Sequence, residues 1–213
     1  VEMIHSEDIN EDNVSRFLGS LNGILVAPGF GSRGIEGKIM TVRYARENQI
    51  PFLGICLGMQ MACVEFGRNV LHLVDCNSTE FKREAENPVI DMMESQKQIH
   101  DLGGTMRLGK YACELKENSL AFQIYQKAVI RERHRHRYEF NSAEYQEAFE
   151  AGGMVMSGVN PDTNLVEIIE IPSHPFFIAT QFHPEYRSTV EVPHPLFTSF
   201  VKAAFDQKRK RKP

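Results

Sequence analysis

The feature that most restricts the possible fold of this chain is a pair of short apolar runs. Each run is followed by a turn that contains glycine and then by an amphipathic stretch. Residues 22–28 have the pattern of a buried strand that enters the loop 29–34, and residues 36–49 have a helical pattern. A second apolar run, 52–56, leads directly into a helix predicted over 58–68. Consecutive units of this kind usually build parallel strands with right-handed crossovers. We therefore expect an α/β fold with a three-layer, open, mainly parallel sheet and flanking helices.

The rest of the chain adds shorter elements and one strongly amphipathic helix. Apolar side chains recur at helical spacing from Leu196 to Phe205. We interpret residues 1–206 as one domain and expect the basic segment 207–213 to be a solvated, frayed end. The remaining elements predicted are a helix over 11–20 and strands over 1–4, 129–140, 153–159, 165–171 and 176–182.

Composition and charge argue against several classes of function. The formal net charge is -4, so nucleic acid is not an expected partner, and no apolar run approaches the roughly 20 residues that span a bilayer. The four cysteines lack zinc-like spacing and disulfide density. We expect a cytoplasmic protein without a membrane partner or a metal, in which Cys63, Cys76 and Cys113 pack as small apolar residues.

The stretch GICLG, residues 54–58, places one cysteine between two glycines where a strand meets a helix. It is the thiol counterpart of a nucleophile elbow, a turn so tight that the positions two residues away on either side must lack bulk, as Gly54 and Gly58 do. The following helix directs N–H groups and its positive dipole end at the sulfur, which favours the thiolate. The same pattern also occurs around core cysteines. On this evidence alone Cys56 is either a packed thiol or a nucleophile.

A second strand end supplies the base that such a nucleophile needs. His183 and Glu185 follow the predicted strand 176–182, and side chains two residues apart in an extended chain leave on the same side. Glu185 can then fix one tautomer of His183 while the other ring nitrogen faces the thiol. Taken alone, the pair is more typical of a solvated strand end. The carboxyl ends of parallel strands share one edge, however, where open α/β sites form.

The segment RERHRHR, residues 131–137, alternates arginine with glutamate and histidine. An extended strand would present its four arginines on one face and the other side chains on the opposite face. No interleaved aromatic residues support base stacking, so a nucleic-acid site is not expected. We expect one arginine to contact substrate and the others to face solvent or a partner. His134 and His136 are rival candidates for the base, without a neighbour arranged as Glu185 is.

Several motifs together resemble the class I glutamine amidotransferases, which have a flavodoxin-like fold. They are GICLGMQ (54–60), QFHPE (181–185) and PGFG (28–31). SRGIEGKI, NSTEF, DLGGTMRLG and RERHRHRYEFN are similar, within that family, to the glutaminase domain of CTP synthases. The resemblance covers residues 1–206. It implies hydrolysis of L-glutamine to glutamate and ammonia through a cysteine thioester.

The resemblance also implies a role for each matching residue. Cys56 attacks the amide of glutamine, His183 moves the proton and Glu185 orients His183. The backbone N–H groups of Gly29 and Leu57 form the oxyanion hole.

Substrate contacts follow from the same resemblance. Glu80 receives the ammonium group of glutamine, and Arg137 pairs with its α-carboxylate. The further residues implied to touch glutamine are Gly29, Leu57, Gly58, Met59 and Gln60.

For the longer enzyme, the resemblance implies a synthetase domain that uses the ammonia for ATP-dependent amination of UTP to CTP. That enzyme is expected to be a homotetramer that uses ATP, UTP and Mg²⁺ and responds to GTP; no cofactor is implied for the domain itself. The sequence departs from the family pattern PGGFG at Ala27 and Pro28. It also begins at what matches the family's second strand, so we expect the first strand and helix to be missing from it.

Two rival functions stay open at this point. One is a stand-alone cysteine hydrolase or peptidase of the same fold, and the other is a non-catalytic interaction module. Glu80 and Arg137 favour a free amino acid as substrate over a peptide. The intact set of Cys56, His183 and Glu185 argues against the module.

Overall fold

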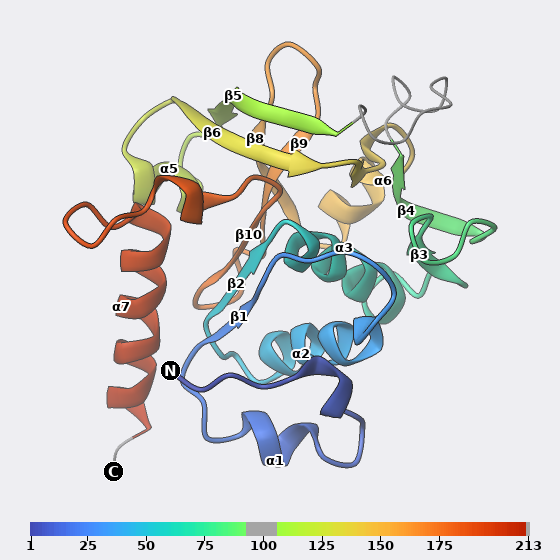
Figure 1. Cartoon of the computed structure of the whole chain (residues 1–213), viewed down its shortest axis with the longest axis vertical. Coiled ribbons are helices and arrows are strands. Elements are labelled where there is room, and N and C mark those ends of the chain that lie inside the picture. The colour runs from blue at the N-terminus through green and yellow to red at the C-terminus, as the bar shows by residue number, and fades with distance from the viewer. Residues whose placement is uncertain (93–105, 212–213) are drawn as a thin grey trace.

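A seven-stranded sheet with helices on both faces forms the body of the protein in the computed structural model, which describes residues 1–92 and 106–211 (Figure 1). The strands are β1 (Ile24–Val26), β2 (Phe52–Ile55), β3 (Cys76–Ser78), β4 (Asn87–Met92), β5 (Arg107–Leu115), β6 (Val129–His136), β7 (Tyr138–Phe140), β8 (Val155–Val159), β9 (Val166–Glu170) and β10 (Phe177–Thr180). The large sheet has the order β1-β2-β10-β9-β8-β5-β6, and β3, β4 and β7 form a smaller sheet.

The helices cover the two faces of the large sheet and give the protein its three layers. They are α1 (Val14–Leu18), α2 (Ile35–Glu47), α3 (Leu57–Asn69), α5 (Leu120–Tyr125), α6 (Ser142–Ala151) and α7 (Pro195–Lys210), with short 3-10 helices η1 (Ser6–Asp8) and η3 (Pro184–Arg187). One core cluster joins α2, α3 and α6 to the sheet. A second cluster lies under α5 and α7. The predicted α/β architecture with flanking helices is confirmed.

The prediction of a mainly parallel sheet was wrong in its strand directions. β1, β2 and β10 run parallel to one another, whereas the pairs β10–β9, β9–β8, β8–β5 and β5–β6 are antiparallel. The physical reason is the length of the connections. β8, β9 and β10 follow one another through short loops, and a parallel crossover needs a dozen residues or more. The sheet is therefore mixed, with its parallel strands at one side.

Three local expectations also differ from the structure. Residues 1–4 form no strand; Val1 and Met3 are fully exposed and pair with no described strand. The predicted strand 129–140 divides at Arg137 into β6 and β7, which belong to different sheets. The basic segment is helical as far as Lys210, because α7 continues through it. The side chain of Arg211 then donates to two backbone carbonyls near α1. Residues 101–105 and 212–213 of the predicted motifs lie outside the described residues.

The three parallel strands end together and so create the edge at which the predicted site lies. Their register aligns Val26 of β1 and Ala179 of β10 with Gly54 of β2. Each of these strands is followed directly by residues that the sequence singled out. Within the described ranges, no helix is long and apolar enough to cross a membrane.

Candidate active site

Cys56 lies on a strained turn between β2 and α3. Its backbone has φ 51° and ψ -102°, a conformation that costs a residue with a side chain and is found mostly at functional sites. A Cβ atom at Gly58 would overlap the carbonyl oxygen of Val26, and one at Gly54 would lie 2.8 Å from the Cβ of Ala179. The steric demand predicted for the two glycines is confirmed.

The neighbouring strand end lies directly beside this turn. The N–H of Cys56 donates to the Thr180 carbonyl at 2.7 Å, which continues the β2–β10 ladder past the end of β2. On the other side, a Cβ at Gly29 would come within 3.2 Å of the Leu57 side chain. The loop after β1 and the first residue of α3 therefore lie close together, as the proximity of the two predicted oxyanion donors requires.

His183 and Glu185 form the predicted pair, but the backbone conformation between them differs from the extended one expected. The Nδ1 atom of His183 lies 2.6 Å from a Glu185 carboxylate oxygen. His183 is extended, whereas Pro184 starts the 3-10 helix η3, which turns Glu185 back toward the ring. The ring also stacks on Tyr186 with centroids 4.8 Å apart. The Nε2 atom of His183 is buried and has no hydrogen-bond partner among the described residues.

Burial of the Cys56 thiol opposes the resting thiolate that the sequence pattern favours. Burial raises the pKa of Cys56 to about 12, more than the N–H of Leu57 at the start of α3 lowers it. The charges of Glu185, Glu139 and Glu80 raise the pKa further. Cys56 is only 5% exposed, so its desolvation outweighs the hydrogen bond that the start of α3 offers. A base is therefore needed to form the nucleophile.

The residues predicted to bind substrate differ in their location and in their exposure. A carboxylate oxygen of Glu80, in the turn after β3, accepts a hydrogen bond from the N–H of Gly31 at 2.9 Å, so Glu80 lies at the glycine loop. Arg137 lies at the bend between β6 and β7 and is half-buried, apart from the exposed arginines of β6. The side chain of Met59 is fully buried in the core, which leaves it no surface for substrate.

A buried charged cluster next to the site was not predicted from the sequence. It consists of Arg107, His134, His136, Glu139 and Glu167. Arg107 lies 2.7 Å from Glu167 and 3.5 Å from Glu139, and the rings of His134 and His136 are joined at 2.9 Å. Burial lowers the pKa of His136 to about 3 and raises that of Glu167 to about 7. The alternation of RERHRHR was the available signal, because it places these histidines opposite the arginines.

The two histidines of this cluster contact each other and neighbouring groups of the cluster. His134 and His136 hydrogen-bond each other, and Nδ1 of His136 lies 3.2 Å from the Tyr138 carbonyl. The other three cysteines are free and buried, as predicted. Among residues 1–92 and 106–211, no group of three or more His, Cys, Asp or Glu side chains is arranged to hold a metal ion.

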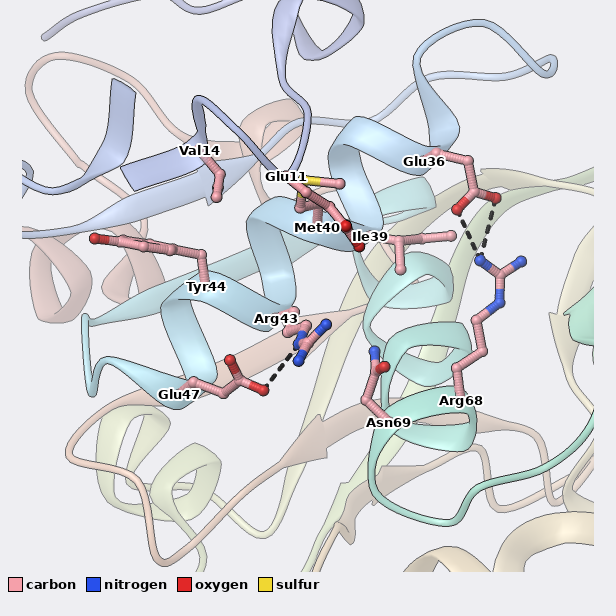
Figure 2. A pocket seen from close by; sticks show the side chains of 10 residues that line it. All are labelled: Glu11, Val14, Glu36, Ile39, Met40, Arg43, Tyr44, Glu47, Arg68 and Asn69. Carbon is pink, nitrogen blue, oxygen red and sulfur yellow. Dashed lines mark hydrogen bonds and ion pairs between the residues drawn. The ribbon is translucent and has the colours of Figure 1, made fainter. Parts of the chain in front are cut away.

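A pocket of about 390 Å³ lies elsewhere, on the outer surface of α1, α2 and α3 (Figure 2). Figure 2 shows two ion pairs among the side chains that line it: Arg68 of α3 with Glu36 of α2 at 2.8 Å, and Arg43 with Glu47, both of α2, at 2.9 Å. Arg68 and Asn69 end α3, about 18 Å along the helix from its catalytic end. This pocket therefore does not belong to the site around Cys56.

Known proteins share both the sequence and the fold. The family described as glutamine amidotransferase class-I matches residues 1–203. CTP synthase of Flavobacterium johnsoniae is 58% identical over 207 residues, and that of Flavobacterium psychrophilum is 61% identical over 207 residues. Each alignment covers 97% of this chain and 38% of the relative, so the chain spans less than half the length of these relatives.

A solved structure adds the likeness in three dimensions. The glutaminase domain of Trypanosoma brucei CTPS, solved with bound acivicin, superposes with a TM-score of 0.90 at 38% identity. The match covers 96% of this chain and 80% of that one. The chain therefore belongs to the class I glutamine amidotransferase family, in the branch represented by the glutaminase domains of CTP synthases.

Proposed function

We propose that this chain hydrolyses L-glutamine to glutamate and ammonia through a thioester on Cys56. The observation that carries the proposal is the strained turn at Cys56, held between the strand end that leads to His183 and the loop that holds Gly29. A nucleophile, a base with its orienting carboxylate and two backbone donors thus come from three neighbouring strand ends.

The first half of the reaction begins with a neutral thiol. Nε2 of His183 takes the proton from Cys56, and the sulfur attacks the side-chain carbonyl carbon of glutamine. The oxyanion of the tetrahedral intermediate accepts hydrogen bonds from the N–H groups of Gly29 and Leu57. The carboxylate of Glu185, 2.6 Å from Nδ1, stabilises the imidazolium that forms.

The second half releases the products. The imidazolium of His183 gives its proton to the departing nitrogen, ammonia leaves and a γ-glutamyl thioester stays on Cys56. His183 then takes a proton from water, which attacks the thioester. Glutamate leaves, and the proton returns to the sulfur.

Recognition of free glutamine rests on the two opposite charges carried by its α-carbon. We assign Glu80 to the ammonium group and Arg137 to the α-carboxylate. We assign the other contacts with glutamine to the backbone groups of Leu57 and Gly58 and to the side chain of Gln60, in the first turn of α3. A peptide would lack one or both charged ends, so this arrangement favours a free amino acid over a peptidase substrate.

We also propose that the ammonia serves a separate synthetase domain for ATP-dependent amination of UTP to CTP. Support comes from the relatives named CTP synthase, of which this chain matches 38%. A cytoplasmic homotetramer that uses ATP, UTP and Mg²⁺ and responds to GTP belongs to that same proposal.

The test is steady-state formation of glutamate from L-glutamine by the wild-type chain, Cys56→Ala and Cys113→Ala. Cys56→Ala should lose at least about 10⁴-fold in kcat, whereas the matched control Cys113→Ala should stay within about threefold. Glutamine placed inside a peptide should not be hydrolysed. Retention of activity in Cys56→Ala, or a preference for the peptide, would refute the proposal. In a protein that also carries the synthetase domain, Cys56→Ala should spare CTP synthesis from added ammonia.

A further inference from the structure

One buried side chain contacts the predicted nucleophile and has no role in the reaction as described above. Gln181 is the first residue after β10 and is fully buried. Its side-chain Nε2 donates to the Cys56 sulfur at 3.6 Å, and its Oε1 accepts from Nε2 of Gln60 at 3.3 Å. The amide therefore lies between the nucleophile and the first turn of α3.

The surroundings fix which way this amide points. Because Gln60 presents an N–H group to Oε1, the NH₂ group of Gln181 must face the sulfur. The backbone N–H of Gln181 is bound to the Glu167 carbonyl at 2.9 Å, which ties its main chain to β9. The side chain cannot turn without leaving a buried polar group unpaired, which is costly.

The contact continues from Gln60 to the segment that carries Arg137. Nε2 of Gln60 also donates to the carbonyl oxygen of Tyr138 at 2.9 Å. His136 approaches that same oxygen at 3.2 Å, and Arg137 lies between these two residues in the chain. A hydrogen-bonded path thus runs from the bend at Arg137 through two glutamine amides to the Cys56 sulfur.

We propose that Gln181 is a positioning residue for the glutaminase reaction: its amide N–H holds the Cys56 sulfur for attack and couples it, through Gln60, to the backbone beside Arg137. The proposal rests on the proposed function and adds to it. An N–H donor stabilises a thiolate more than a thiol, so Gln181 favours the charged form at the moment the proton leaves. The tie to the Arg137 bend keeps the sulfur in register with the bound substrate.

The test compares Gln181→Met with the wild-type chain and with Gln123→Met, the same change at an exposed glutamine of α5. Alkylation of Cys56 by iodoacetamide is followed by mass spectrometry of its peptide over a range of pH. Removing one hydrogen bond to a charged group should slow alkylation about tenfold at each pH below the pKa of Cys56, which displaces the logarithmic profile by about one pH unit. Gln123→Met should overlay the wild type. An unchanged profile in Gln181→Met would overturn the proposal.

Two further measurements separate a positioning role from loss of folding. Gln181→Glu serves as the second variant in case Gln181→Met does not fold. It keeps the volume of the side chain but places a carboxyl group beside the sulfur, so its alkylation profile should move at least as far. In both variants kcat for glutamine should fall about tenfold with KM within about threefold, at unchanged far-UV circular dichroism. Equal losses in kcat and in folded fraction would indicate a structural role only. If the wild type hydrolysed no glutamine, the proposed function would fail, whereas the alkylation profiles would still decide the contact with sulfur.

Discussion

Gly58→Ala tests whether close approach of two backbones builds the turn at Cys56. The added Cβ would overlap the Val26 carbonyl oxygen and lie 3.1 Å from its carbon. These are main-chain atoms of β1, so no side-chain rotation can relieve the contact. Either the N-terminal turn of α3 or the end of β1 must move.

The expected cost follows from this geometry. Overpacking against atoms that cannot rotate away costs about 1–3 kcal/mol, and the reduced freedom of the unfolded chain returns about 0.5 kcal/mol. A net loss of about 1.5 kcal/mol lowers Tm by about 3–6 °C in a chain of this size. Since Leu57 starts the displaced turn, alkylation of Cys56 should also change in rate.

Thermal unfolding and the iodoacetamide rate are measured side by side, with Gly29→Ala as the matched control for stability. A Cβ at Gly29 meets only the end of the Leu57 side chain, at 3.2 Å, which can move aside. Gly29→Ala should therefore change Tm by less than about 2 °C. Equal Tm values for Gly58→Ala and wild type would refute the idea that the Val26 backbone sets the turn.

Two further predictions concern the buried cluster around Arg107. Arg107→Met leaves Glu167 and Glu139 buried without their cation, so the free energy of unfolding in urea should fall by about 3–5 kcal/mol. The control Arg43→Met removes a half-exposed ion pair and should lower that free energy by less than about 1 kcal/mol. Similar losses in the two variants would contradict the reasoning. Burial raises the pKa of Glu167 to about 7 from the usual 4.5, so the folded state keeps a proton that the unfolded chain releases between these pH values. The stability of the wild type relative to Glu167→Gln should therefore fall as pH rises from about 4.5 to about 7, and a difference independent of pH would count against it.

The strand-to-helix turns could be predicted because their constraints are local. GICLG requires small residues on both sides of Cys56, and the structure shows the two close contacts that explain why. The pairing of His183 with Glu185 was also predicted, since residues two apart remain within reach in several backbone conformations. The catalytic roles of these residues stay predictions.

Long-range effects could not be predicted from the sequence. The alternation in β6 is confirmed, but only the fold shows that Glu132, His134 and His136 point inward. Arg137 leaves the arginine face because the chain passes there from one sheet to the other. Burial by many segments raises the pKa of the Cys56 thiol, and the local sequence around the turn does not reveal this burial.

Covalent labelling by an alkylating analogue of glutamine tests the central claim most directly. The chain is treated with this analogue, with and without excess L-glutamine, and its intact mass and peptides are measured. We expect a single adduct, on Cys56, with the labelling rate reduced by L-glutamine and not by a peptide that contains glutamine. An adduct on Cys63, Cys76 or Cys113, or labelling of Cys56 that L-glutamine leaves unchanged, would contradict a glutamine site at this thiol.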